Sequence, residues 1–452
     1  MSSGSSLALM AVSAQDSLLT ADGDNSGAAV TFFRQTLELS TRFQSEHVSF
    51  TPSGSISWGR KVSFNITRIG DMLAHSYVRI VLPALYNDAT GAPVPSVTVG
   101  TDVFATYTWV PLVGYAVVQE AALIVGGSTI SKITKDVNVI IHELFTAAGR
   151  VGGLDQLVGY GDAASPLSNS MEHTLYVPLN GLFFSEYATS LPLVALQFHP
   201  VTIELTLGRF EDVVTLSPGA PAATDFGSPA APENKDLVDL TLLCEMILLA
   251  NKERTVIAQS PHTISITQWQ TETDSVGQAS VYKAKLGMNH PVSALFYFLS
   301  LDADRDTLSK ITGSNKVAED HFRDPFKWGG NRFQNNPIIN SSLQLNSHTR
   351  FDHDGVFTGL LTAYERASNV PDVSRGLNMY SFALNPADDS ICSGSVSFSR
   401  MDNVQLNLRI NPDYYTPYGG AADKSNATLT VVAKSWNAIS ILSGMLGLQF
   451  AA

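Results

Sequence analysis

The densest group of metal-ligating side chains in this sequence is Asp352-His353-Asp354, with His348 close by. Carboxylates and imidazoles are the ligands that divalent metals take in proteins. The segment continues into Gly355, however, and Asp and Gly are also the residues that form β-turns. We therefore expect a turn at residues 352–355 and no metal site.

Two further segments match only part of a known metal motif. Residues 22–27 (Asp-Gly-Asp-Asn-Ser-Gly) have the opening spacing of an EF-hand calcium loop, but Phe33 stands where the bidentate Glu is required. His142-Glu143 could begin a zinc-protease helix, but Thr146 replaces its second His. We expect a polar turn at 22–27 and no zinc at His142.

Phosphate and nucleophile motifs also fail. Gly126-Gly127-Ser128 lacks the downstream glycine and lysine of a phosphate loop, so a hairpin turn is expected. The chain contains no Gly-x-Ser-x-Gly elbow and no Cys-x-x-Cys pair. Its two cysteines, Cys244 and Cys392, are predicted to be inert buried thiols. The sequence thus predicts no catalytic, metal or cofactor-binding residue, no cofactor and no enzyme.

Asn65, Asn340 and Asn426 fit the N-glycosylation pattern, which matters only in the secretory pathway. The first basic residue is Arg34, so a signal peptide is not expected. The sequence contains no run of 18 apolar residues, so a transmembrane helix is not expected. We therefore expect these three to be ordinary asparagines.

The composition is apolar and poor in charge. The 452 residues suffice for two or three domains. Apolar residues make up 44% and charged residues only 15%, against about 25% in an ordinary soluble domain. The net charge is −13 and no basic run occurs, so direct nucleic-acid binding is not expected.

Alternation of apolar and polar residues predicts strands in both halves of the chain. The strand-like segments are 62–67, 201–207, 264–267, 343–345, 396–399, 404–410 and 429–431, and the apolar run 240–249 is typical of a buried strand. Helical spacing is scarce. In one candidate helix Ile133, Val137, Ile140, Ile141 and Leu144 share a face. These patterns predict two all-β halves with long loops and a few short helices.

The sequence predicts an amino-terminal arm followed by two domains. Residues 1–28, rich in Ser, Ala, Gly and Asp, read as an amino-terminal arm. The Pro- and Ala-rich residues 217–232 forbid regular structure and predict a long loop or linker. Placing the boundary after the buried strand gives a first domain over 29–251 and a second over 252–452.

Motifs in the amino half resemble the double jelly-roll major capsid proteins of nucleocytoplasmic large DNA viruses. The similar segments are Leu9–Thr20, Thr31–Arg34, Arg68–Leu73 with Leu82-Pro83, Ala122–Ile130, Leu175-Tyr-Val-Pro-Leu179 and Leu191–His199. The carboxyl half continues the match in the family's order. Its segments are Asn289–Val292, Leu343–His348 with Arg350-Phe351, Tyr380–Pro386, Ser393-Gly394, Phe398–Arg400, Trp436-Asn437 and Ser443–Leu448.

The chain departs from the family at residues 180–188 and in the loop 217–232. The resemblance implies two consecutive eight-stranded jelly-roll β-sandwiches. It also implies a structural protein of a large icosahedral double-stranded DNA virus, whose trimers form pseudo-hexagonal capsomers that tile the shell. Implied partners are further copies of the chain, minor capsid, penton and cement proteins, and an internal membrane. The implied location is the virion, with synthesis and assembly in the host cytoplasm.

Other functions remain open at this point. A double jelly-roll scaffolding protein of a membrane-containing virus would have the same fold. A carbohydrate-binding β-sandwich is less favoured, because it should expose aromatic platforms and carry a signal peptide. Finally, the alternating segment Ala427–Ala433 and the apolar residues after it predict a closing strand beside the first strand of the second sandwich.

Overall fold

The computed structural model describes residues 40–85, 107–161, 171–216, 235–302, 324–330, 335–415 and 425–450, with residues 167 and 333 and the backbone of 98–99 and 102–103. The predicted arm 1–28, the segment 22–27 and the loop 217–232 lie outside these residues. Residues 43–452 form one compact unit, to which every element below belongs.

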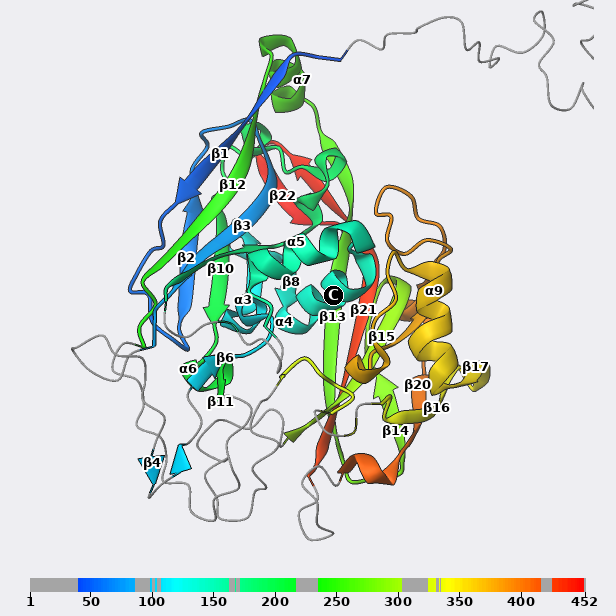
Figure 1. The fold of residues 1–452 in the computed structure, drawn as a ribbon. Helices are drawn as coiled ribbons and strands as arrows, with labels where there is room; N and C mark the ends of the chain where they lie inside the picture. Colours follow the sequence, from blue (N-terminus) through cyan, green and yellow to red (C-terminus); the bar gives the residue numbers. More distant parts are fainter. Residues whose placement is uncertain are drawn as a thin grey trace, which may run out of the picture. The chain divides into compact units, whose positions relative to one another are not determined.

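Eight strands of the amino half build a sandwich of two four-stranded antiparallel sheets (Figure 1). The strands are β1 (Phe43–Phe50), β2 (Lys61–Ile66), β3 (Met72–Leu82), β7 (Val118–Val125), β8 (Ser128–Thr134), β9 (His173–Pro178), β10 (Val201–Leu207) and β12 (Asp239–Leu249). One sheet has the order β1-β12-β3-β9 and the other β2-β10-β7-β8. We call this sandwich the first roll.

Eight strands of the carboxyl half repeat the arrangement and form the second roll. They are β13 (His262–Gly277), β14 (Val281–Leu286), β15 (Pro291–Leu301), β16 (Ile338–Leu345), β17 (His348–Asp354), β18 (Asn378–Ser381), β20 (Val404–Ile410) and β21 (Ala427–Leu442). The sheets run β13-β21-β15-β18 and β14-β20-β16-β17, with the short strands β19 (Val396–Ser397) and β22 (Met445–Leu448) added to the first of them.

The two rolls share one topology. In each, the first sheet joins the first, eighth, third and sixth strands, and the second sheet joins the second, seventh, fourth and fifth. That order is the jelly roll, a double-sheet sandwich of eight strands. The predicted fold, two consecutive jelly rolls with a few short helices, is confirmed.

Shorter elements lie in the connections. They are β4 (Thr98–Val99), β5 (Asp102–Val103), β6 (Tyr107–Trp109), α3 (Val113–Val117), α4 (Lys135–Ile140), η1 (Ile141–Phe145), α5 (Ala148–Val158), η2 (Phe183–Ser185), η3 (Tyr187–Thr189), η4 (Leu193–Ala195), α6 (Phe210–Val213), β11 (Val214–Leu216), α7 (Asn251–Gln259), η7 (Phe357–Leu361), α9 (Thr362–Arg366), η8 (Val373–Arg375), η9 (Phe398–Arg400) and η10 (Pro412–Tyr415). The predicted helix exists as α4 and η1, although Ile133 ends the strand before it.

Burial along the strands follows the sequence pattern. In β10, buried and half-buried residues alternate, as expected for a strand with one face toward a core. In β15, every residue after Pro291 is buried, so both faces of this strand are covered. One apolar cluster fills the first roll and extends into the second, and a separate cluster fills the second sandwich.

Two local predictions are wrong. Residues 352–354 end strand β17 instead of forming a turn, because Phe351 faces the core and anchors the strand. The hairpin turn lies earlier, at Asn346 and Ser347, where φ is 48° and 69°. Residues 396–399 form only the two-residue strand β19, since η9 begins at Phe398.

The Gly126-Gly127 hairpin is confirmed. It joins β7 to β8 with φ of 59° at Gly126 and 82° at Gly127, values that residues other than Gly and Asn rarely adopt. A Cβ on Gly126 would also lie 2.6 Å from the ring of His199. The turn therefore needs glycine for both conformation and space.

The predicted closing strand is confirmed as β21, which pairs with β13 from Ala427 to Ile441 and with β15 on its other side. Its distal part differs from the prediction. Ile439 and Ile441 pack in the cluster that fills the first roll, not in the core of the second sandwich. We retain residue 251 as the proposed domain boundary, since β12 ends before it and α7 begins there.

Candidate assembly surfaces

The main contact between the rolls is an aromatic seam. Phe145, the last residue of η1, lies against the outer face of the sheet β13-β21-β15-β18. Its ring centroid is 5.8 Å from that of Phe296 and 6.4 Å from that of Trp269. Lys434 Nζ lies 5.0 Å from the Phe145 centroid, a cation–π contact. The first roll thus covers the outer face of this sheet.

A buried ionic group joins the same elements. The guanidinium of Arg375 bonds Glu143 of η1 at 3.0 Å and Asp324 at 2.9 Å. All three side chains are at least 86% buried. Removing one partner of such a group is expensive because the remaining charges stay desolvated. Glu143 therefore fixes the seam and is not a catalytic base.

His142 is also structural. Its Nε2 lies 3.0 Å from Asp155 of α5 and its Nδ1 lies 3.4 Å from the Tyr115 hydroxyl. Burial, with the charges of Asp155 and Glu143, raises the pKa of Tyr115. The partial zinc-protease pattern thus holds η1, α5 and α3 together.

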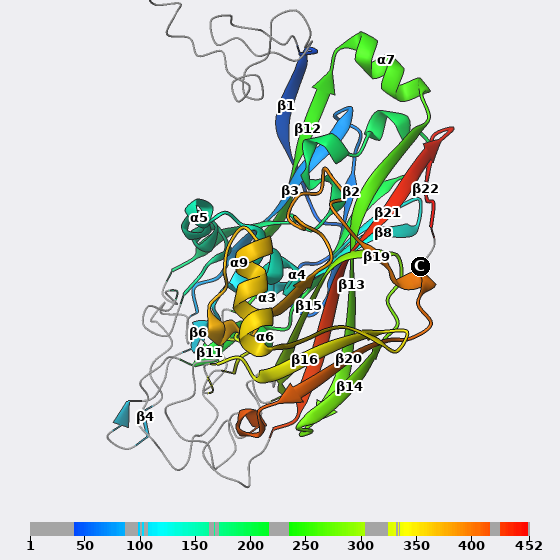
Figure 2. The same cartoon turned by 90° about the vertical axis from the view of Figure 1, so that its right-hand side faces the viewer.

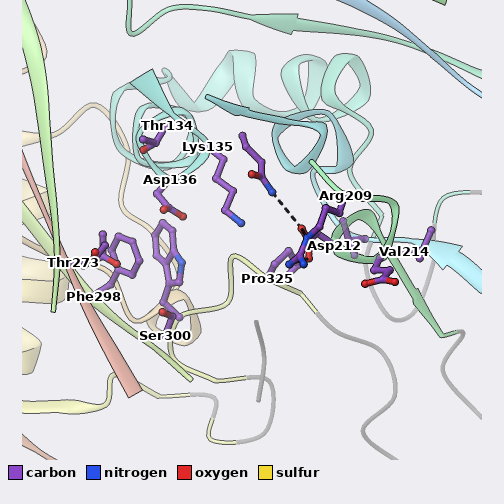
Figure 3. Close-up of a pocket in the computed structure, with 15 residues that line it drawn as sticks. Thr134, Lys135, Asp136, Arg209, Asp212, Val214, Thr273, Phe298, Ser300 and Pro325 are labelled. Carbon is purple, nitrogen blue, oxygen red and sulfur yellow. Dashed lines mark hydrogen bonds and ion pairs between the residues drawn. The ribbon is translucent and has the colours of Figure 1, made fainter. Parts of the chain in front are cut away.

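A pocket of about 320 Å³ lies between the rolls (Figure 3). Lys135 and Asp136 line one wall, Arg209 and Asp212 another, and Trp328 lies stacked on Phe298 at a centroid distance of 3.7 Å. Arg209 pairs with Asp212 at 3.2 Å. No histidine or cysteine is among the described residues that line the pocket.

The carboxyl end also joins the rolls. The backbone N–H of Leu446 donates to His199 Nδ1 at 3.2 Å, and the N–H of Phe198 donates to the Gly444 carbonyl at 3.2 Å. The hairpin β21-β22 therefore runs from the second roll onto the first roll (Figure 2).

The remaining candidate residues are separate. Within the described residues no cluster of three metal-ligating side chains occurs. Asn65 and Asn426 are exposed and Asn340 is half-buried; Asn340 donates to Asp352 Oδ1 at 2.8 Å. That these asparagines are unmodified stays a prediction. None of the helices in the described part of the chain is long and apolar enough to cross a membrane.

The cysteine prediction is half right. Cys244 is buried, and burial raises the pKa of its thiol to about 12, which makes it unreactive. Cys392 is exposed in a loop, not buried in a strand. The Ser-rich sequence around it is a turn-rich connection, which alternation alone did not distinguish from a strand.

The sequence analysis missed the seam residues Phe145, Trp269 and Arg375. One signal was available: the run Val292–Leu301 is apolar on both faces, which is typical of a strand covered on both sides. Nothing in the sequence showed which element covers it.

Two fused jelly rolls joined by a buried seam define a double jelly-roll protein. Comparison with known families identifies it further. Residues 31–248 match the amino-terminal model of major capsid proteins, and residues 253–447 match the model for large eukaryotic DNA virus major capsid proteins. The chain belongs to this family of major capsid proteins, and these are not enzymes.

Similar proteins extend over the whole chain. The major capsid protein of Pyramimonas orientalis virus is 28% identical and that of Phaeocystis pouchetii virus 26% identical, each with 99% of both chains covered. Among solved structures, PBCV-1 VP54 matches with a TM-score of 0.72 at 24% identity, over 93% of this chain and all of that one. The Faustovirus major capsid protein matches with a TM-score of 0.67 at 11% identity, over 92% and 93%.

Proposed function

We propose that this chain forms the shell of a large icosahedral DNA virus as trimeric capsomers of pseudo-hexagonal outline. The observation that carries this proposal is the internal repeat. Two rolls of one topology in each chain give six sandwiches in a trimer. A ring of six similar units has the near-hexagonal shape that fills a flat facet.

The composition supports the same function. Only 15% of residues are charged. A protein that buries broad flanks against copies of itself benefits from few charges there, because each unpaired charge costs several kcal/mol to desolvate. Containment of the genome is thus mechanical, with no chemical step.

The finer partners belong to this proposal. Minor capsid, penton and cement proteins would join capsomers, and an internal membrane would separate the shell from DNA. Synthesis and assembly would take place in the host cytoplasm. The net charge of −13 agrees with a protein that does not bind DNA directly.

Electron microscopy of the purified protein tests the shape. Threefold particles with a hexagonal outline are expected, and single two-lobed particles would contradict the proposal. Mass spectrometry of purified mature virions separates shell from scaffold. An abundant shell protein is expected, whereas presence in immature particles alone would favour the scaffold.

A further inference from the structure

The two rolls can be compared residue by residue. Strands β3 and β15 are the third strands of their rolls and both have eleven residues. The sixth residue is Tyr77 in one and Phe296 in the other. The neighbouring strands give a second match: Trp269 pairs with Lys434 in the second roll as His47 pairs with Glu245 in the first.

The acceptor face in the second roll is occupied. Trp269, Phe296 and Lys434 hold Phe145, and a loop covers Lys434 through an ion pair with Asp389 at 2.5 Å. This is the seam described above.

The corresponding face of the first roll, which we call the free face, comprises His47, His75, Tyr77, Tyr187 and Glu245. Here too a loop covers the charged position, since the Tyr187 hydroxyl donates to Glu245 Oε2 at 3.2 Å. His47 is exposed, Tyr77 is half-buried and Tyr187 is 59% exposed. The ring of Tyr187 lies edge-on to His75 at a centroid distance of 4.9 Å. Among the described residues, no ring from another element lies on Tyr77 and His47 as Phe145 lies on Phe296 and Trp269.

The covering helix is also repeated. In each roll the fifth strand has seven residues and leads into a helix with a π-helical segment, η1 after β8 and η7 after β17. Phe145 lies eleven residues after the end of β8, and Tyr364 lies ten residues after the end of β17. Val356, immediately before η7, Leu361 in η7 and Tyr364 in α9 are 66%, 41% and 76% exposed. Figure 2 shows α9 on the surface toward the viewer.

We infer that η7 and α9 of one copy dock on the free face of the next copy, as η1 docks on the second roll within the chain. This inference rests on the proposed capsomer and names its contact. Because the helix and the face lie on different rolls, the contact is head-to-tail and repeats until a ring closes. Six rolls then alternate around the ring through one type of contact.

The aromatic residue on each helix fits the charged residue of the face that it meets. Phe145 meets the cation Lys434, for which an aromatic face is attractive. Glu245 takes the place of Lys434 in the first roll, and an aromatic face does not attract a carboxylate. Glu245 is only 6% exposed and already accepts from Tyr187, so the polar group exposed at this position is the Tyr187 hydroxyl, with which the hydroxyl of Tyr364 can hydrogen-bond. The tyrosine thus matches the free face as the phenylalanine matches the seam.

Cross-linking of the full chain tests the contact. In a Cys392→Ser background, the double variant Tyr364→Cys and Tyr77→Cys is treated with a short bifunctional maleimide and run on a denaturing gel. The matched control replaces Tyr364→Cys with Val256→Cys, on α7 and 62% exposed. Bands of two and three linked chains are expected for the first variant and single chains for the control.

The outcomes separate this inference from the proposed function. Trimers in sedimentation without cross-linked bands would overturn the docking contact and leave the capsomer standing. Monomers in sedimentation would overturn both. A second variant, Tyr364→Asp, is expected to raise the concentration for half-assembly by about tenfold or more, since central aromatic contacts dominate interfaces. Val256→Asp should leave it unchanged, and equal effects of the two variants would contradict the inference.

Discussion

The same sheet occurs twice in this chain and meets two different surroundings. In the second roll its outer face carries Phe296 and Trp269 and is covered by the first roll. In the first roll the corresponding positions are Tyr77 and His47, and both retain contact with solvent. Topology therefore does not decide whether the outer face of a sheet is covered within the chain or open to solvent. The buried rings of Phe296 and Trp269 belong to a contact made within the chain, whereas the amphipathic Tyr77 and His47 fit a face that is wet before assembly.

Deleting residues 436–452 should have the largest effect on this comparison. The deletion removes β22 and the distal half of β21, including Ile439, Ile441 and Leu446, which pack with the first roll. Each large buried residue contributes on the order of 2–5 kcal/mol, and a domain has roughly 5–15 kcal/mol in total. We expect an insoluble chain or one that proteases cut readily beyond residue 255. Soluble trimers with unchanged melting temperature would refute this role of the tail.

A matched pair of substitutions compares the two faces directly. Phe296→Ala should lower the free energy of unfolding by about 3–5 kcal/mol, because the ring is fully buried and leaves a cavity. Tyr77→Ala should cost about 1 kcal/mol or less in the monomer, since its ring is only half-buried. Denaturant titration at low protein concentration measures both. Equal losses would show that the two faces are equally covered within the chain.

The ionic group at the seam gives a smaller effect. Arg375→Met should cost about 3 kcal/mol, because Glu143 and Asp324 would remain buried without their cation. Adding Glu143→Gln and Asp324→Asn should restore much of the loss. If the triple variant is as unstable as the single one, packing of the arginine stem and not its charge holds the seam.

The smallest effect depends on pH. His290 and Asp71 occupy equivalent positions in the two rolls, immediately before β15 and immediately before β3. Burial lowers the pKa of His290. The unfolded chain, with a histidine pKa of about 6.5, then binds protons more readily than the folded one. The contribution of neutral His290 to the free energy of unfolding is therefore complete above pH 6.5 and is lost as the pH falls below it. His290→Asn, which tolerates the φ of 68°, should lose less melting temperature between pH 7.5 and 5.5 than the parent.

The sequence predicted much of the fold because alternating strands such as 201–207 report a half-buried face directly. The family motifs predicted the order of the two rolls. Two local predictions are wrong. The acidic residues of 352–354 lie on the exposed side of a strand and form no turn, and Phe398 begins a helix where a strand was predicted. The seam was beyond prediction because Phe145 and Trp269 lie far apart in the chain. Only the tertiary fold brings them together.

Sedimentation equilibrium of the parent protein beside its Tyr364→Asp variant tests whether the next copy binds at the free face of the first roll. At micromolar concentration in physiological salt we expect a mass of three times 48.6 kDa for the parent protein, and a shift toward 48.6 kDa for Tyr364→Asp. A parent protein that sediments at 48.6 kDa under these conditions would contradict the account, since the free face would then have no partner of its own kind.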